Sequence, residues 1–468
     1  MTNFDPWLAC EDRLDLWTPG VRGVRLWPLI RFGVMMHYEF RRAGYGSPFV
    51  RINSLDRIGP ARWRSLIRAA YRFRQVRTAP GDAMFVSSAG RRVASENERH
   101  SIDRHHGHYY NLFERPWIFE FQVGNYHPKP DPTQSSRIVN ADLMWAVAVL
   151  QASCMTLQAG ELRLIHDLAD VVTRTFDLDA PVESLANMIA RKVAQSVALK
   201  ARLRFDTQSA TSHRNAFVTE ASYMNAPYSV FVSALRESGF RVFEVQHGLV
   251  YPHHAAYNFS PQAHQNQDHP ARELLPHVLL TYGNWWHGQI RYPGKCEAVG
   301  CQYLNDTVDN IQSKGGHNPR RILIISARLI ESKLSALAKD LAAALPDHQI
   351  VFKLHPMEPP TMSQLNVLAA MPNVRIEHRS NIYEELGKCG SVVGYYSTAL
   401  FEAAAFERKR IFFLDGLGVP GELGQAFNET DELIEMLKDP AVGHPNIDTH
   451  AIWAPDWKRR IRTVLDLS

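Results

Sequence analysis

The chain has 468 residues, of which 45% are hydrophobic and 21% charged, a composition that supports a large core and a length typical of two domains. Its 52 Lys and Arg residues against 48 Asp and Glu residues give a formal net charge of only +4, so the charge balance does not indicate nucleic-acid binding. The five cysteines are scattered without a CxxC pair, which argues against a disulfide framework and a structural zinc site and favours a cytoplasmic location.

The N-terminal part of the sequence predicts neither a signal peptide nor a membrane-spanning helix. No apolar run reaches the ~18 to 20 residues that a spanning helix needs, and the first residues, "MTNFDPWLACEDRLDLW", lack an apolar signal core. Residues 20–44 mix aromatic and aliphatic side chains with arginines, a pattern that allows peripheral contact with the inner membrane. The same pattern fits a helix packed on its own domain with solvated arginines, and we favour that interpretation.

Short apolar runs that end in small or polar residues recur along the first half of the chain. They lie at residues 82–90, 117–122, 215–222, 240–248 and 277–283. Runs of this length and composition are typical of buried parallel strands. Helical patterns at residues 140–158, 161–176 and 184–205 separate several of them.

The second half of the chain repeats this alternation. Strand-like runs lie at residues 320–328, 348–356, 373–378, 390–397 and 409–416, with helical patterns at 331–345 and 398–407. Alternating strands and helices predict an α/β protein with two doubly wound, Rossmann-like domains.

The polar stretch at 305–319 has no apolar period, so it is the expected linker between the two domains. It separates an N-terminal domain at 1–304, which carries an N-terminal extension, from a C-terminal domain at 320–445. Residues 446–468 are expected to form a C-terminal helix that could return to the first domain.

Polar residues follow several of these predicted strands. In open α/β sheets ligands bind at the carboxyl ends of the strands, and two such domains would face each other across a cleft. The candidate site residues at the strand ends are Glu220, Gln246, His247, Gly248, Arg328, Lys353, His355, Ser397 and Thr398.

The C-terminal half predicts a nucleotide-binding site. Ser397 and Thr398 lie between a strand and a helix, where hydroxyls and free backbone N–H groups can bind a phosphate, although such a pair is most often a plain helix cap. Glu402, one turn into the helix, is placed to accept hydrogen bonds from ribose hydroxyls. The residues expected to add positive charge and donors are Arg328, Lys333, Lys353 and His355.

Three motifs resemble those of a known group of enzymes. "FEVQHG", "FKLHP" and "GYYSTALFEAAAFERKRIFF" are similar to bacterial surface-polysaccharide glycosyltransferases of the GT-B fold, which include capsule Kdo transferases, polysialyltransferases and teichoic-acid glycerophosphotransferases. The resemblance implies that His355, Ser397 and Thr398 contact the donor phosphate. "ISARLIESK" resembles the Arg-Leu and Lys signature of sugar-nucleotide transferases, with Arg328 and Lys333 at matching spacing.

The sequence departs from this group at one position. Retaining GT-B enzymes of the commonest family carry two glutamates, but Gly394 stands where the first would be and only Glu402 remains. The sequence therefore indicates neither a retaining nor an inverting outcome.

We expect a glycosyltransferase that moves a sugar, or a sugar-like acid, from a nucleotide donor, such as a CMP- or CDP-linked one, to a surface glycan or lipid-linked glycan without a metal or cofactor. Glu220 is the expected general base and His247 the expected donor to phosphate or sugar. Gly248 would let the chain turn close to the ligand while Gln246 holds the loop. In the alternative interpretation, Gln246 to Gly248 merely end the strand.

Three other functions remain open from the sequence. Two are enzymatic: transfer of a polyol phosphate from a CDP-alcohol, and epimerisation of a nucleotide sugar on the same fold. The third is a non-catalytic subunit that binds glycan.

Two groups of histidines are candidates for other roles. His105, His106 and His108 could supply imidazoles to a metal, but no carboxylate or cysteine stands at ligand spacing, so a solvated or substrate-facing loop is preferred. His253 and His254 follow the strand end that carries His247 and could belong to an acceptor site.

Overall fold

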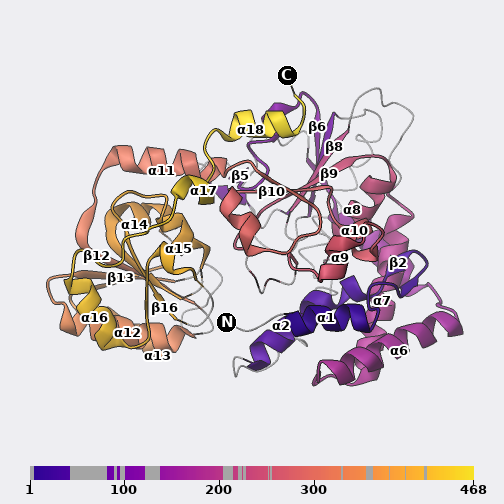
Figure 1. The fold of residues 1–468 in the computed structure, drawn as a ribbon, viewed down its shortest axis with the longest axis horizontal. Coiled ribbons are helices and arrows are strands. Elements are labelled where there is room, and N and C mark those ends of the chain that lie inside the picture. Colours follow the sequence, from indigo (N-terminus) through magenta and orange to yellow (C-terminus); the bar gives the residue numbers. More distant parts are fainter. Residues whose placement is uncertain are drawn as a thin grey trace.

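The computed structural model describes residues 5–42, 82–88, 92–94, 101–121, 138–203, 214–219, 224, 228–250, 252, 254, 256–327, 330–354, 362–378, 380–395, 397–415 and 419–467. Two α/β units lie side by side (Figure 1). Each has a parallel sheet at its centre, and helices near the N-terminus form a further layer beside the first unit.

The first sheet has seven strands in the order β11-β10-β9-β8-β3-β6-β7, and neighbouring strands run parallel. Its strands are β3 (Ala83–Ser88), β6 (Pro116–Phe121), β7 (Ile138–Asn140), β8 (Asn215–Thr219), β9 (Arg241–Val245), β10 (Val278–Thr281) and β11 (Lys295–Ala298). β10 is buried at every position, as expected for a parallel strand covered on both faces. Two short ribbons, β1 (Gly20–Val21) with β2 (Val24–Arg25) and β4 (Arg92–Ala94) with β5 (Ser101–Asp103), are antiparallel.

The second sheet has six parallel strands in the order β14-β13-β12-β15-β16-β17. They are β12 (Asn318–Ile325), β13 (Gln349–Lys353), β14 (Val374–Glu377), β15 (Cys389–Gly394), β16 (Arg410–Leu414) and β17 (Gln425–Phe427). Two parallel sheets with intervening helices confirm the predicted fold class of two doubly wound α/β domains.

Helices connect the strands and cover the sheets. Beside the first sheet these are α5 (Asp142–Ser153), α6 (Ala159–Thr175), α7 (Val182–Lys200), α8 (Tyr228–Glu237), α9 (Pro261–Gln265) and α10 (Pro270–Leu274). In the second domain they are α12 (Glu331–Ala344), α13 (Met362–Ala369), α14 (Ile382–Lys388), α15 (Thr398–Ala403) and α16 (Thr430–Lys438). None of the helices in these described ranges is long and apolar enough to cross a membrane.

The N-terminal extension packs on the first domain through α1 (Asp5–Arg13) and α2 (Arg31–Arg42). Trp27, Ile30 and Val34 are fully or almost fully buried in the main core. Arg31 is also buried, and its guanidinium pairs with the buried carboxylate of Glu11. These three apolar side chains face protein, whereas Tyr38 on the same helix is exposed, and contact of residues 20–44 with a membrane stays a prediction.

The predicted linker is mostly helical. α11 (Gln302–Lys314) covers most of residues 305–319, and only residues 315–317 separate it from β12. Leu304 and Val308 are buried along this helix. The mostly polar sequence and the glycines that follow the helix had indicated a linker and not this apolar contact.

The C-terminal segment (residues 449–467) crosses to the first domain (Figure 1). It contains α17 (Thr449–Ile452) and α18 (Trp457–Val464), whose buried Ile461 packs in one cluster with Phe243 and Leu280 of the first sheet. The crossing is close because the backbone N–H of Ala454 donates to the carbonyl of Tyr282 at 2.7 Å.

Candidate functional site

The carboxyl ends of the two sheets contact each other at one point. Gly248 follows β9, and a Cβ atom placed on it would lie 3.6 Å from the Thr398 hydroxyl oxygen at the start of α15. Ser397 caps α15, with its Oγ accepting a hydrogen bond from the Ala399 backbone N–H at 3.2 Å. The structure therefore brings together the two turns that the sequence selected, one from each domain.

An apolar contact lies beside this point. The ring of Phe401 in α15 is 5.1 Å from the ring of Trp286 in the first domain. The indole Nε1 of Trp453 donates to the Phe401 carbonyl at 3.1 Å, and its ring is 5.1 Å from that of Tyr282. Aromatic packing of this kind fixes the two domains relative to each other.

Gln246 holds the turn after β9. Its side chain is buried, the Nε2 group donates to the Gly248 carbonyl at 2.8 Å, and the Oε1 atom accepts from the Tyr282 backbone N–H at 2.9 Å. The amide thus connects its own turn to the end of β10. This geometry is the one expected from a residue that holds the loop.

His247 is half-buried and lies next to a hydrogen-bonded pair, Tyr257 and Glu244, that the sequence analysis missed. Its Nδ1 atom lies 3.3 Å from the hydroxyl of Tyr257, and that hydroxyl donates to the Glu244 carboxylate at 2.7 Å. Tyr257 and Glu244 are both fully buried. A clue was present in the sequence, because Glu244 interrupts an apolar strand and a buried carboxylate requires a hydrogen-bond donor.

Glu402 contacts the side chains of Tyr383 and Arg104. Its side chain is buried, its Oε1 accepts from the Tyr383 hydroxyl at 2.9 Å, and the same oxygen lies 3.9 Å from a guanidinium nitrogen of Arg104. Burial raises the pKa of Glu402, while Arg104 and Tyr383 oppose this shift. In the structure Glu402 thus pairs with Arg104 of the first domain, and its contact with ribose stays a prediction.

Lys353 also has protein partners, and its predicted contact with the donor phosphate stays a prediction. It is buried, and its ammonium group donates to the carbonyls of Leu354 at 3.2 Å and His378 at 3.1 Å. Burial lowers the pKa of Lys353, whereas Glu377 and Glu385 raise it. The side chain therefore joins the ends of β13 and β14 and does not offer a solvated cation.

The remaining predicted residues divide into two groups. Lys333 is exposed in the first turn of α12, which follows β12 in sequence. Glu220, Arg328 and His355 lie outside the described residues, so their roles stay predictions.

The histidine-rich loop is organised by Asp103 at the end of β5. Its carboxylate accepts from the backbone N–H groups of His105 and His106, at 2.9 and 3.0 Å, and from the Tyr110 hydroxyl at 2.8 Å. Burial raises the pKa of Asp103, but the side chains of His106, His105 and Ser87 lower it more, so the carboxyl is held below its usual range. No group of residues suited to hold a metal ion occurs in the described part of the chain.

Of the two histidines suggested for an acceptor site, the structure describes only His254. His253 is outside the described residues. Burial lowers the pKa of His254 to about 3, so the imidazole is neutral at physiological pH. Its Nδ1 accepts from the Ala256 backbone N–H at 3.2 Å, which is a local structural role.

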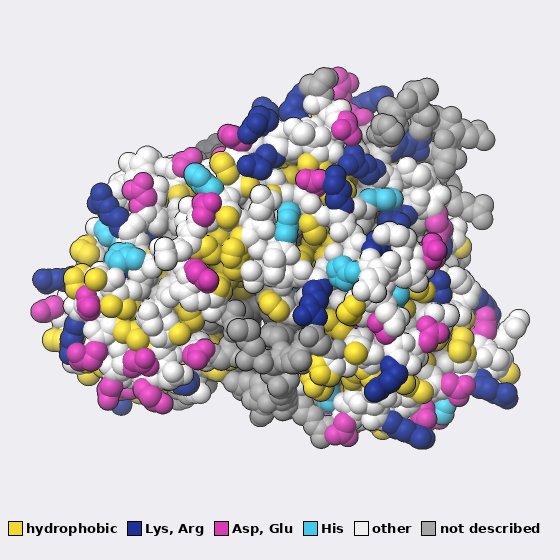
Figure 2. Space-filling view, viewed as in Figure 1, with side chains coloured by type: hydrophobic (Ala, Val, Ile, Leu, Met, Phe, Trp, Pro, Cys, Tyr) yellow, Lys and Arg dark blue, Asp and Glu magenta, His cyan; other side chains and the backbone are white. Residues whose placement is uncertain are grey.

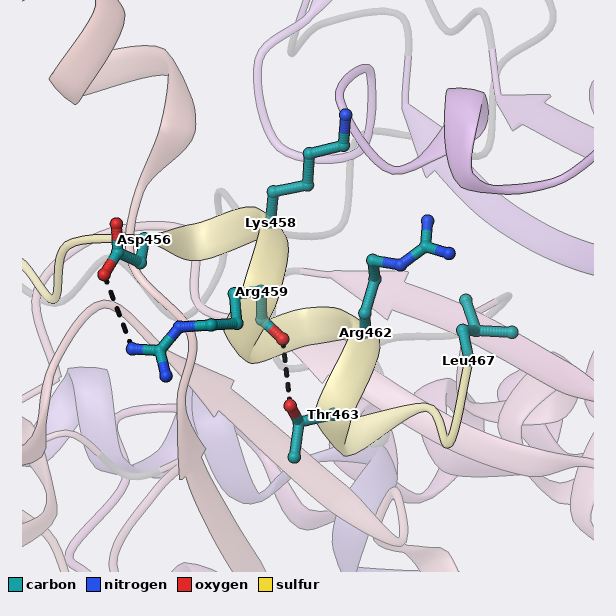
Figure 3. Close-up of a pocket in the computed structure, with 6 residues that line it drawn as sticks. All are labelled: Asp456, Lys458, Arg459, Arg462, Thr463 and Leu467. Carbon is teal, nitrogen blue, oxygen red and sulfur yellow. Dashed lines mark hydrogen bonds and ion pairs between the residues drawn. The ribbon is translucent and has the colours of Figure 1, made fainter.

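A pocket of about 770 Å³ lies on α18, away from the predicted site residues (Figure 3). Arg459 pairs with Asp456 at 3.4 Å on one side, while Lys458 and Arg462 extend from the helix. Basic side chains also gather over the region of α18 in the space-filling view (Figure 2). This pocket is an open basic surface and contains none of the predicted site residues.

No family model matches the sequence, and no curated protein matches it either. Solved structures match more widely: the UDP-GlcNAc 2-epimerase of Neisseria meningitidis bound to UDP-GlcNAc has 10% identity and a TM-score of 0.42, over 82% of this chain and 99% of that one. S. aureus MnaA with UDP has 12% identity and a TM-score of 0.42, over 83% and 98% of the two chains.

A third similar structure is MurG of Acinetobacter baumannii, with 9% identity and a TM-score of 0.39 over 83% of this chain and 100% of that one. The three structures are thus named as a UDP-GlcNAc 2-epimerase, as MnaA and as MurG. At such identities and TM-scores neither a substrate nor a reaction can be transferred to this chain.

Proposed function

We propose that the chain is a glycosyltransferase that moves a sugar from a nucleotide-activated donor to a bacterial surface glycan. One observation carries this proposal: the turn with His247 and the turn with Ser397 and Thr398 meet where the two sheets end. In α/β domains this edge binds ligands, and a transfer reaction needs two substrates to meet there.

The two sides offer complementary chemistry. The first domain supplies an imidazole, a group that can accept or donate a proton near neutral pH. The second supplies the hydroxyls of Ser397 and Thr398, which suit the phosphate of a donor, and His355 and Arg328 are proposed to bind the same phosphate. This division assigns the donor to the second domain and the glycan acceptor to the first.

A panel of donors tests the proposal. CMP-, CDP-, UDP- and GDP-linked sugars should be screened for a rise in the thermal midpoint, because a ligand that binds only the folded state stabilises it. The stabilising donor is then incubated with an acceptor glycan, with and without EDTA, and nucleotide release is measured. We expect release only with acceptor, and equally with the chelator.

Other products would identify the alternatives. Formation of an epimer without acceptor would establish an epimerase, and transfer of a polyol phosphate from a CDP-alcohol would establish a phosphotransferase. Glycan binding with no stabilisation by any nucleotide would refute the enzymatic proposal in favour of a binding subunit.

A further inference from the structure

We propose that His247 is the proton acceptor of the transfer reaction, and that Tyr257 and Glu244 are positioning residues that keep its proton on Nδ1 and its lone pair on Nε2. This inference deepens the proposed function and rests on it. It replaces the earlier expectation that Glu220 is the base and His247 only a donor.

The first step concerns Glu244. It is fully buried in β9 between Phe243 and Val245, and burial of a carboxylate is costly unless donors satisfy it. The Tyr257 hydroxyl donates to its Oε1 at 2.7 Å. A phenol has a single proton, so this bond determines the orientation of the Tyr257 hydroxyl.

The second step concerns the tautomer of His247. With its proton directed to Glu244, the Tyr257 oxygen presents lone pairs to Nδ1 of His247, 3.3 Å away. A hydrogen bond there requires Nδ1 to carry the proton. In the neutral ring, Nε2 then holds the lone pair, as a proton acceptor needs.

The described neighbours of His247 determine whether its ring can take up a proton during the reaction. They include the Tyr257 hydroxyl, which connects it to Glu244, the His105 ring at 6.5 Å, and His254, whose pKa is lowered first by burial and then by His247. Because His254 is neutral, it adds no positive charge that would oppose protonation of His247 during the reaction.

The reaction step balances with these groups. The acceptor hydroxyl gives its proton to Nε2 of His247 while its oxygen forms a bond to the anomeric carbon of the donor sugar. The bond from that carbon to the phosphate oxygen breaks, and the nucleotide leaves with the electron pair. The imidazolium formed is stabilised through Tyr257 by Glu244 and later loses its proton to solvent.

The tautomer can be measured without any activity. In protein labelled with ¹⁵N-histidine, the His247 signals are identified among the 21 histidines by their loss in His247→Asn. We expect the Nδ1–H form in the native chain and a shift toward the Nε2–H form in Tyr257→Phe. A native Nε2–H form would overturn the proposal whether or not the chain is a transferase.

The matched control is Tyr292→Phe. It removes another buried tyrosine hydroxyl, one whose recorded hydrogen bond runs to the Pro276 carbonyl at 3.5 Å. This variant should leave the His247 signals unchanged. A change in those signals would show that a general loosening of the core, and not the hydrogen bonds of Tyr257 with Glu244 and His247, sets the tautomer.

Kinetics then test the catalytic role. Tyr257→Phe should lower kcat about 10- to 100-fold, the range for outer partners that orient a histidine, with little change in KM for the donor. In a His247→Ala background the same change should have no further effect, and added imidazole should restore part of the activity. An independent, additive loss, or a larger loss in Glu220→Gln than in His247→Ala, would reject His247 as the base.

Discussion

Replacing Gly300 with Ala should loosen the crossing of the C-terminal segment over the first domain. Gly300 has a φ of +90°, and a Cβ atom on it would lie 2.3 Å from the carbonyl oxygen of Ala454. That distance is too short for any real contact, so the segment must move. Ala454 is also the residue whose N–H donates to Tyr282 at 2.7 Å, and the movement would break this hydrogen bond.

The expected loss combines three contributions. A left-handed backbone costs an alanine about 1–2 kcal/mol. The lower entropy of the unfolded chain returns about 0.4–1 kcal/mol. Loss of the buried hydrogen bond adds about 1–3 kcal/mol. Together these predict a loss of about 1–5 kcal/mol; its centre, about 3 kcal/mol, corresponds to local opening that is roughly 140-fold more frequent.

Amide hydrogen exchange of peptides from residues 449–465 measures this opening directly. Gly316→Ala is the control, since Gly316 has a similar φ of +97° but no atom within 4 Å of its Cβ position. It carries the backbone strain without the contact. Equal exchange of the C-terminal peptides in the two variants would refute the argument that the close approach at Gly300 holds the segment.

Three further predictions follow from the buried groups and the site. Ser397→Ala should weaken donor binding by about 1–3 kcal/mol in calorimetry, and unchanged affinity would remove this residue from the phosphate site. Because burial raises the pKa of Glu402, the native chain should lose stability as the pH rises from 4.5 toward the folded-state pKa. The urea midpoint should fall over this pH range in the native chain and change less in Glu402→Gln. A native midpoint that does not fall there contradicts the prediction. Arg31→Met should lower the free energy of unfolding by about 3–5 kcal/mol, because it leaves the carboxylate of Glu11 buried without its arginine. The double variant with Glu11→Gln should lose less. A larger loss in the double variant would contradict the idea that an uncompensated charge causes the effect.

The sequence predicted the central strands well and the edge strands poorly. The runs at 240–248 and 277–283 contain β9 and β10. They could be recognised because parallel strands buried on both faces consist of nearly continuous apolar residues. The edge strands β7, β11 and β17 were missed, whereas β14, also at an edge, was predicted at 373–378. The missed strands are only three or four residues long, so a single sequence offers little to detect.

At the site, the sequence predicted which turns carry the candidate residues but not which side chains those residues contact. His247 and Ser397 follow apolar strands, so their place at a sheet edge could be predicted from the pattern. The partners Tyr257 and Arg104 could not, because they are fixed by side-chain contacts between distant elements. For Glu402, helix spacing predicted its place in α15 but not its pairing with Arg104 of the other domain.

The C-terminal crossing also constrains the order in which the chain can fold. The face of the first sheet that carries Phe243 and Leu280 is packed in part by Ile461 and Leu465, which come about 170 residues after the last strand of that sheet. At a synthesis rate of about 5–20 residues per second, Ile461 and Leu465 are made on the order of 10–30 s after this sheet. The whole second domain is made during that interval. The first domain thus completes its core last, although its strands are synthesised first, and nascent chains released before Ile461 should expose this apolar face to chaperones.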